Sequence, residues 1–268
     1  MCSLFSPAGL QRLDTVIGPR LLCAFDFDGT LAPIVPVPAQ AHLPEEIRDL
    51  LLRLSVHAPV AIITGRSVQD IRGRLGFEPD FVVGNHGLEG VPGWETLALE
   101  HEALCRMWWV QLTQALNGVE YDSGIMLEDK GYSLSVHYRG ARDADHAARA
   151  LEQLFARLSP RPRVVAGKYV FNLLAEDACH KGSALARIMQ LCAARNAVYV
   201  GDDVTDEDVF RLRRKDVLSI RVERSDDSAA DFYLPHPHDI LFLLEELVHR
   251  LRLQEARNWR QAATVGSA

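Results

Sequence analysis

The chain has 268 residues, of which 48% are hydrophobic and 24% charged, as in an ordinary globular protein of one or two domains. Its net charge of −7, from 29 basic and 36 acidic side chains, gives no electrostatic case for a nucleic acid or an anionic membrane as partner. Five scattered cysteines without a C-x-x-C pair exclude a disulfide framework and favour a reducing compartment. We find neither a signal peptide nor an apolar run of about 18 residues, so the sequence predicts a cytoplasmic protein.

Three short apolar segments in the first third of the chain alternate with helical patterns. They predict buried strands at residues 20–26, 59–65 and 80–87. Because these segments are apolar throughout, we expect a Rossmann-like α/β core, with a parallel sheet covered by helices on both faces. Functional groups gather at the carboxyl ends of such strands, and Asp26, Thr64 and Asn85 fall there.

The pattern changes near residue 101 and returns near residue 178. Residues 101–177 read as helix, two strands, helix and two more strands, the last two resembling a hairpin around Gly167 and Lys168. We interpret this segment as an inserted α+β domain with an antiparallel sheet. Residues 1–100 and 178–268 then form the core domain, and the tail from about residue 255 is expected to fray.

Two aspartates stand one residue apart where the first strand ends, in the stretch LLCAFDFDGTLAP. Residues i and i+2 of an extended segment point the same way, so the carboxylates of Asp26 and Asp28 can share one small site. Their repulsion is costly unless a cation lies nearby, and a hard divalent cation with oxygen ligands resolves it. The alternative is an acid-rich turn or helix cap, which the strand-end position disfavours.

A second pair of acids follows the strand near residue 200. In VYVGDDVTDEDVF, Asp202 and Asp203 come directly after Gly201. Thr205 and the later acids fit a helix N-terminus, but this does not account for the pair at the strand end. Two such pairs in one parallel sheet predict a shared Mg²⁺ site.

Thr64 and Lys181 complete the candidate core site. Thr64 ends the second strand, where its hydroxyl and the amide of Gly65 can donate to a phosphate oxygen; the alternative is a helix-capping threonine. Lys181 begins a helix, where the dipole disfavours a cation, so a role as counter-charge to acids and phosphate is more plausible than a surface lysine.

The motifs DFDGT, IITGR, HKG and GDD occur in this order between residues 26 and 203, and this ordered set resembles the haloacid dehalogenase superfamily of Mg²⁺-dependent phosphotransferases. The resemblance implies that Asp26 is the nucleophile and Asp28 the general acid and base. It also implies that Thr64 and Lys181 hold the phosphoryl oxygens. The implied metal ligands are Asp26, Asp28 through its backbone carbonyl, Asp202 and Asp203.

An insert between the Thr64 and Lys181 motifs resembles the C2-type cap of that superfamily. Within it, LEDKGYSLSVHYR is similar to the trehalose-6-phosphate phosphatases, as is GDDVTDEDVF in the core. That resemblance implies that Glu128 and Lys130 grip the distal sugar. The remaining candidate substrate-binding residues are Thr64, Gly65, Arg66, His137, Arg139, Asn172 and Lys181. The alternative for the cap stretch is a solvated amphipathic strand.

One position departs from the family pattern. In VFNLLAEDACHKG, Asn172 stands where the family has Glu, and Leu174 where it has a basic residue. An amide still hydrogen-bonds sugar hydroxyls but is a weaker acceptor than a carboxylate. The sequence thus leaves open a phosphatase or phosphomutase acting on another sugar phosphate, such as sucrose 6-phosphate or a hexose phosphate. A catalytically silent binding module is disfavoured because all core motif residues are present.

Overall fold

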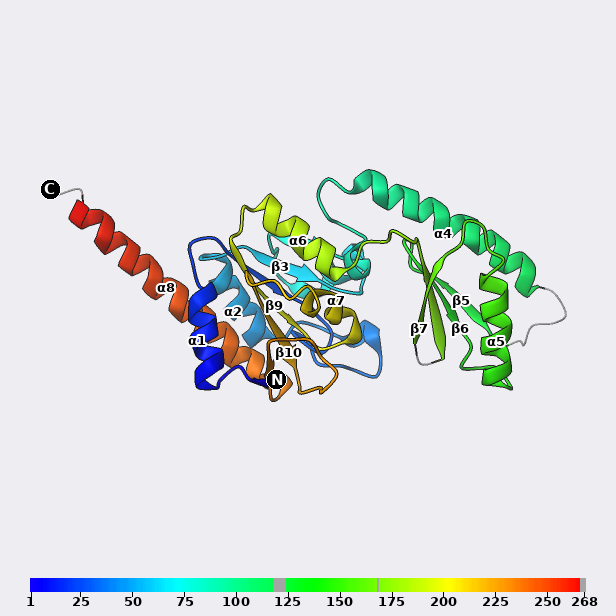
Figure 1. Cartoon of the computed structure of the whole chain (residues 1–268), viewed down its shortest axis with the longest axis horizontal. Coiled ribbons are helices and arrows are strands. Elements are labelled where there is room, and N and C mark those ends of the chain that lie inside the picture. The colour runs from blue at the N-terminus through cyan, green and yellow to red at the C-terminus, as the bar shows by residue number, and fades with distance from the viewer. Residues whose placement is uncertain (118–123, 168, 266–268) are drawn as a thin grey trace. The chain divides into compact units, whose positions relative to one another are not determined.

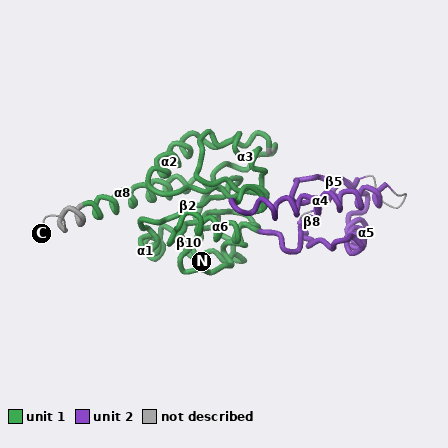
Figure 2. The backbone as a smooth tube through the Cα atoms, turned by 90° about the horizontal axis from the view of Figure 1, so that it is seen from above, with its two compact units in different colours: residues 1–91, 180–268 green, residues 92–179 purple. Residues whose placement is uncertain are grey.

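The structure is a computed structural model that describes residues 1–117, 124–167 and 169–265. The chain divides into two compact units, residues 1–91 with 180–268 and residues 92–179 (Figure 2). The second unit contains the predicted insert and also residues 92–100 and 178–179. Lys168, which the sequence places in the turn of the second hairpin, lies outside the described residues.

A seven-stranded parallel sheet forms the centre of unit 1, in the order β1-β11-β10-β9-β2-β3-β4. Figure 1 labels three of these strands, β3, β9 and β10. Every neighbouring pair is parallel, which confirms the predicted core. The strands are β1 (Cys2–Ser3), β2 (Leu21–Phe25), β3 (Val60–Ile63), β4 (Phe81–Val83), β9 (Asn196–Gly201), β10 (Val217–Val222) and β11 (Phe232–Leu234).

Helices cover both faces of this sheet because successive strand residues point to opposite sides. On one face, Phe25 and Ile62 share a core with Leu51 of α2 (Glu45–Ser55) and Leu247 of α8 (Ile240–Val265). The helices are α1 (Pro7–Val16), α2 (Glu45–Ser55), α3 (Val68–Leu75), α6 (Lys181–Leu191), α7 (Glu207–Phe210) and α8 (Ile240–Val265). Short 3₁₀ turns lie at η1 (Pro38–Gln40), η2 (Asn85–Gly87), η3 (Val204–Asp206) and η4 (Pro237–Asp239).

Both ends of the chain differ from the expectation. The sequence did not indicate β1 or α1, although Ser6 caps α1 by accepting a hydrogen bond from the backbone N–H of Gly9. The prediction that the tail frays from about residue 255 is wrong, because α8 continues to Val265 (Figure 1). Trp259 lies on this continuation with 81% of its surface exposed.

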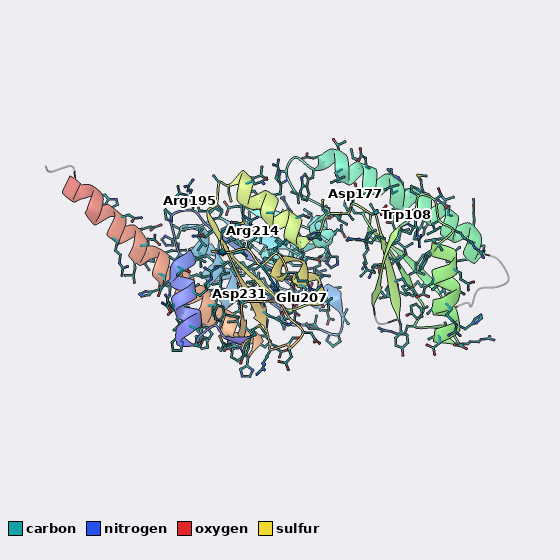
Figure 3. All side chains as sticks on the ribbon, in the orientation of Figure 1. Trp108, Asp177, Arg195, Glu207, Arg214 and Asp231 are labelled. Atoms are coloured by element: carbon teal, nitrogen blue, oxygen red, sulfur yellow. The ribbon has the colours of Figure 1, made fainter. Side chains whose placement is uncertain are left out.

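Unit 2 has the predicted helix-strand-strand-helix-strand-strand order. Its elements are α4 (Glu95–Leu116), β5 (Met126–Asp129), β6 (Leu134–His137), α5 (Ala144–Phe155), β7 (Arg163–Gly167) and β8 (Val170–Leu174). The strands form an antiparallel sheet in the order β5-β6-β8-β7, which confirms the predicted sheet type. Trp108 of α4 is buried and donates its indole N–H to the carbonyl of Pro160 at 2.6 Å (Figure 3).

The two faces of this second sheet differ in polarity. Val136 and Phe171, which are register partners, are buried on one face. Glu128, Ser135 and Asn172 form a register row across β5, β6 and β8 on the opposite face. The alternation predicted from the sequence therefore gives unit 2 one apolar face and one polar face.

Within the described residues, none of the helices combines the length and apolar character that a membrane span requires.

Candidate active site

The acids of the first motif lie at the carboxyl end of β2. Asp26 is buried and donates its backbone N–H to the carbonyl of Val200 in β9, so the chain leaves β2 beside β9. Gly29 has a φ of +84°, and a Cβ there would lie 2.1 Å from Oδ2 of Asp202. The hydroxyl of Thr30 donates to Oδ1 of Asp202 at 3.2 Å. Gly29 and Thr30 thus allow the second acid cluster to approach the first.

Three carboxylates converge at this point. Asp26, Asp202 and Asp206 each offer an oxygen atom, and these atoms lie within 4.8 Å of one another. The carboxylate of Asp206 accepts four hydrogen bonds. Its Oδ1 accepts from Tyr199 Oη at 2.6 Å and from Lys181 Nζ at 2.7 Å. Its Oδ2 accepts from the backbone N–H groups of residues 202 and 203, each at 2.9 Å.

Lys181 is a buried cation between two of these acids. Its side chain is 2% exposed, and Nζ lies 2.8 Å from Oδ1 of Asp26 and 2.7 Å from Oδ1 of Asp206. Burial alone lowers the pKa of Lys181, but the two carboxylates raise it by more, so the pKa lies above its ordinary value. The lysine is therefore charged at neutral pH, and the alternative of a surface lysine is wrong.

Three carboxylates converge around this single lysine, so their negative charges exceed its positive charge when all are ionised. Burial raises the pKa of Asp26 above its ordinary value, with Lys181 opposing and Asp206 adding to the shift. Burial and the neighbouring Asp206 and Asp203 raise the pKa of Asp202 to about 6. A further cation would relieve this repulsion.

The donor set fits a divalent metal ion with oxygen ligands, because carboxylates converge there from β2 and from the β9–α7 connection. The convergent acids are Asp26, Asp202 and Asp206, and Asp206 was not among the predicted ligands. Asp203 is exposed and is not one of the three.

The carboxylate of Asp28 points to an arginine. Arg66 holds it with two hydrogen bonds of 2.6 Å, from Nε to Oδ2 and from Nη2 to Oδ1. Arg66 also donates to Asp70 at 2.8 Å, and Asp70 accepts from Arg74. Hydrogen bonding from Arg74 lowers the pKa of Asp70 to about 2, and Arg66 adds to the shift. A line of alternating charges therefore fixes the side chain of Arg66 beside Asp28.

Thr64 lies at the end of β3, as predicted, and its side chain is buried. Its Oγ1 accepts from the backbone N–H of Arg66 at 3.3 Å. Thr64 does not cap a helix; Ser67 caps α3 by accepting from the N–H of Asp70 at 3.2 Å. Thr64, Gly65 and Arg66 therefore lie in the loop between β3 and α3, as the sequence predicts for Thr64.

The cap candidates share the polar face of unit 2. Glu128 Oε2 lies 2.8 Å from His137 Nε2 and 3.9 Å from Lys130 Nζ. The hydroxyl of Ser135 donates to Oδ1 of Asn172 at 2.6 Å. Four predicted residues thus lie on or beside one sheet face, whereas Arg139, which is exposed, follows the end of β6.

Sequence reasoning missed two buried groups in unit 1. Asp206 looked like one of several acids in the first turn of a helix, and Tyr199 like an ordinary strand residue. The 3₁₀ turn η3 instead directs Asp206 back to the end of β9, where Tyr199 meets it. The spacing of Asp202 and Asp206 was the available signal, but it does not distinguish an inward carboxylate from a helix cap.

Comparison with known proteins decides the family. The model of the trehalose-phosphatase family matches residues 24–237. The chain belongs to the trehalose-phosphatase family. The match spans both units and includes the Asp26, Thr64, Lys181 and Asp202 positions together with the whole insert.

Curated relatives of this trehalose-phosphatase family member include longer proteins. An uncharacterised glycosyl hydrolase of Mycobacterium tuberculosis is 32% identical over 268 residues, covering 92% of this chain and 19% of that protein. Trehalose-phosphate phosphatase B of Arabidopsis thaliana is 27% identical, covering 90% of this chain and 71% of that protein. The chain thus spans about a fifth of the length of the first of these relatives.

Solved structures show the same fold. The C-terminal domain of the Candida albicans trehalose-6-phosphate phosphatase superposes with a TM-score of 0.65 at 22% identity, covering 91% of this chain and 98% of that one. The Aspergillus fumigatus enzyme gives a TM-score of 0.61 at 25% identity, covering 93% and 100%. This trehalose-phosphatase family member therefore shares the fold of these proteins, with one unit built on a parallel sheet and a second unit built on an antiparallel sheet.

Proposed function

We propose that this chain hydrolyses trehalose 6-phosphate to trehalose and phosphate, with Mg²⁺ as the divalent ion, through an aspartyl-phosphate intermediate. The observation that carries the proposal is the position of Lys181, buried between Asp26 and Asp206 beside Asp202 in a trehalose-phosphatase. A buried carboxylate with a fixed cation and an adjacent metal site is suited to attack a phosphate dianion.

In the first step, a carboxylate oxygen of Asp26 attacks phosphorus and the ester P–O bond breaks. Lys181 already hydrogen-bonds Oδ1 of Asp26, so Oδ2 is the proposed nucleophile. Asp28 must carry a proton when this step begins, and it gives that proton to the departing sugar alkoxide. The buried hydroxyl of Thr64 and the charge of Lys181 hold the phosphoryl oxygens, and Arg66 orients Asp28.

In the second step, water attacks the phosphorus of the aspartyl-phosphate. Asp28 takes a proton from this water, the bond between phosphorus and the Asp26 oxygen breaks, and phosphate leaves. When bound, Mg²⁺ offsets the negative charge of the acids and of the phosphoryl group. Asp26 and Asp202 would hold it, with Asp206 beside them. Both oxygens of Asp206 already accept hydrogen bonds, so this residue is suited to orient Lys181 and the backbone at Asp202.

We assign sugar recognition to the polar face of unit 2. Glu128 accepts and Lys130 donates hydrogen bonds to the distal hydroxyls, and His137 orients Glu128. Gly65 contributes its backbone amide and Asn172 its free amide hydrogens, and Arg139 remains a candidate from the motif alone. The cytoplasmic location remains a prediction of the sequence.

Asn172 favours a second candidate, a phosphatase of the same superfamily that acts on another sugar phosphate. Its Oδ1 is occupied by Ser135, so the side chain offers N–H donors where a carboxylate would offer only acceptors. A substrate that presents oxygen acceptors at this row would then be preferred over trehalose 6-phosphate.

A phosphate-release assay over a panel of sugar phosphates, with Mg²⁺ and with EDTA, tests both candidates. We expect Mg²⁺-dependent release that is fastest with trehalose 6-phosphate. A faster rate with sucrose 6-phosphate or a hexose phosphate supports the second candidate. No release from any phosphate ester in Mg²⁺ contradicts the phosphatase proposal itself.

A further inference from the structure

The turn after β4 lies against both phosphate-binding segments of unit 1. This turn, residues 84–89, begins at Gly84 and closes at Glu89, whose backbone groups exchange hydrogen bonds of 3.0 and 3.2 Å with those of Gly84. Asn85 and His86 have φ values of +48° and +57°, in the left-handed region that non-glycine residues avoid. Two such residues in succession require support from their surroundings.

The first contact of the turn is with the loop that carries Thr64. The backbone N–H of His86 donates to the carbonyl of Thr64 at 2.9 Å, and that of Asn85 to the carbonyl of Arg66 at 2.8 Å. The His86 ring lies over Gly65, where a Cβ would come 2.4 Å from Cε1. The turn therefore holds the peptide groups of residues 64–66 in place through these hydrogen bonds.

The second contact is with the start of α6. A Cβ on Gly87, which has a φ of +112°, would lie 2.6 Å from the carbonyl carbon of His180 and 3.0 Å from the backbone nitrogen of Lys181. Only a glycine permits this approach. One six-residue turn thus touches the segments that carry Thr64 and Lys181.

The side chain of Glu89 joins the turn to the Thr64 loop. Its Oε2 accepts from Nδ2 of Asn85 at 2.8 Å and from the backbone N–H of Val68, the first residue of α3, at 2.8 Å. One oxygen therefore holds both the left-handed residue and the end of the loop. A carboxylate at a helix N-terminus is also favoured by the helix dipole.

We propose that Glu89 is a positioning residue for phosphate binding, because it locks the turn 84–89 against the Thr64–Val68 segment. This inference rests on the proposed function for the role of Thr64. Glu89 itself is negative and contributes no attraction to phosphate, so its effect is geometric. Removing its side chain frees Asn85 to leave the left-handed conformation and loosens the N–H groups of residues 64–68.

Three variants of the full chain test this inference, with inorganic phosphate as the probe in the presence of Mg²⁺. Glu89→Ala removes both hydrogen bonds, and we expect phosphate binding about tenfold weaker by calorimetry. Glu89→Gln keeps an oxygen that accepts from the same two N–H groups, so binding should stay within about threefold of the original. Glu46→Ala removes an exposed glutamate of α2 and serves as the control.

Steady-state kinetics and hydrogen exchange complete the test. In Glu89→Ala, KM for the sugar phosphate should rise more than kcat falls, and amides of residues 64–68 should exchange faster. Tighter phosphate binding in Glu89→Ala would mean that the charge of Glu89 matters more than its position. An equal loss in Glu89→Gln would also overturn the inference.

The exchange measurement separates this inference from the proposed function. If the original protein binds no phosphate and hydrolyses no ester, the proposed function fails. Amide exchange at residues 64–68 then still decides whether Glu89 orders that segment, and unchanged exchange in Glu89→Ala would contradict the inference on its own.

Discussion

The two polar regions of this molecule differ in how firmly their side chains are held. At the end of the unit 1 sheet, Asp26, Lys181 and Asp206 are nearly inaccessible, and Lys181 donates a hydrogen bond to each of the two carboxylates. On the polar face of unit 2, the side chain of Glu128 is 47% exposed and that of Lys130 33%. The first arrangement is a rigid buried network, whereas the ion pairs of the second are open to solvent and contribute little to stability.

The largest effect should come from the nucleophile. Asp26→Asn keeps the shape of the side chain and its place beside Lys181 but removes the attacking carboxylate. We expect turnover to fall at least about 1,000-fold while the circular dichroism spectrum is unchanged. Phosphate release under saturating substrate measures it, and full Mg²⁺-dependent activity in this variant would show that another group attacks phosphorus.

The next largest effect is expected on stability. Lys181→Met should strongly lower the free energy of unfolding, because it leaves two buried carboxylates without their cation. Breaking such a pair costs about 3–5 kcal/mol of the free energy of unfolding, measured by urea titration. Lys181 lowers the pKa of Asp26, so its removal raises that pKa further, and the folded variant keeps a proton to a higher pH than the folded original protein. Burial already raises the pKa of Asp26 in the original protein to about 8, so the loss relative to the original should grow as the pH rises above about 8.

The control for this prediction is Lys215→Met, which removes an exposed lysine and should change the free energy of unfolding by less than about 0.5 kcal/mol. Equal stabilities of the two methionine variants would mean that the charges around Asp206 are balanced in some other way.

Substitutions on the polar face of unit 2 should change KM for trehalose 6-phosphate but not for a phosphate ester without a sugar. Glu128→Ala should raise KM for trehalose 6-phosphate about tenfold, because it removes a charged acceptor for sugar hydroxyls. The same variant should hydrolyse p-nitrophenyl phosphate as the original does. Kinetics with both esters make the comparison, and equal changes in KM would contradict a role in sugar recognition. Lys130→Ala is expected to behave in the same way.

Asp202 and Asp203 provide a matched pair of substitutions that tests metal binding. Asp202 faces Asp26 and Asp206, whereas the neighbouring Asp203 is exposed. Mg²⁺ at about 100 times its Kd stabilises the folded state by about 2.7 kcal/mol, which should raise Tm by several degrees. Asp202→Asn should remove most of this rise in a thermal-shift assay, and Asp203→Asn should keep it. If Asp203→Asn removed the rise and Asp202→Asn kept it, Asp203 would be a metal ligand, as the sequence predicted.

The smallest effect is expected at Asn172. Asn172→Glu places a stronger acceptor next to Ser135, whose hydroxyl can still donate to it. We expect kcat/KM for trehalose 6-phosphate to rise about threefold, a gain of less than 1 kcal/mol. A decrease, together with a preference of the original protein for another sugar phosphate, would favour the second candidate function.

The parallel sheet of unit 1 could be predicted, although not the order of its strands, because strands such as β2 and β3 are apolar throughout and are followed by polar residues. Asp26, Thr64 and Lys181 were placed correctly for the same reason: strand ends and helix starts meet at one edge of a parallel sheet. The predicted antiparallel insert followed from the change to alternating polarity after residue 124.

Long-range side-chain geometry could not be predicted in this way. Asp206 and Glu89 resemble ordinary helix and loop acids in sequence, and only the backbone turns around them decide where their carboxylates point. Asp28 is a similar case, because its bidentate pairing with Arg66 joins residues 38 positions apart. Such contacts depend on the conformations of several loops that are far apart in the sequence, and local sequence patterns do not determine these conformations.

The positions of the tryptophans give unit 2 an optical signal of its own. Three of the four, Trp94, Trp108 and Trp109, belong to residues 92–179, and the fourth, Trp259, is already largely in contact with solvent. The intrinsic fluorescence change on denaturation therefore follows the melting of unit 2, while ellipticity follows both units. A fluorescence midpoint that precedes the ellipticity midpoint would show that the inserted unit opens while the parallel sheet is still intact.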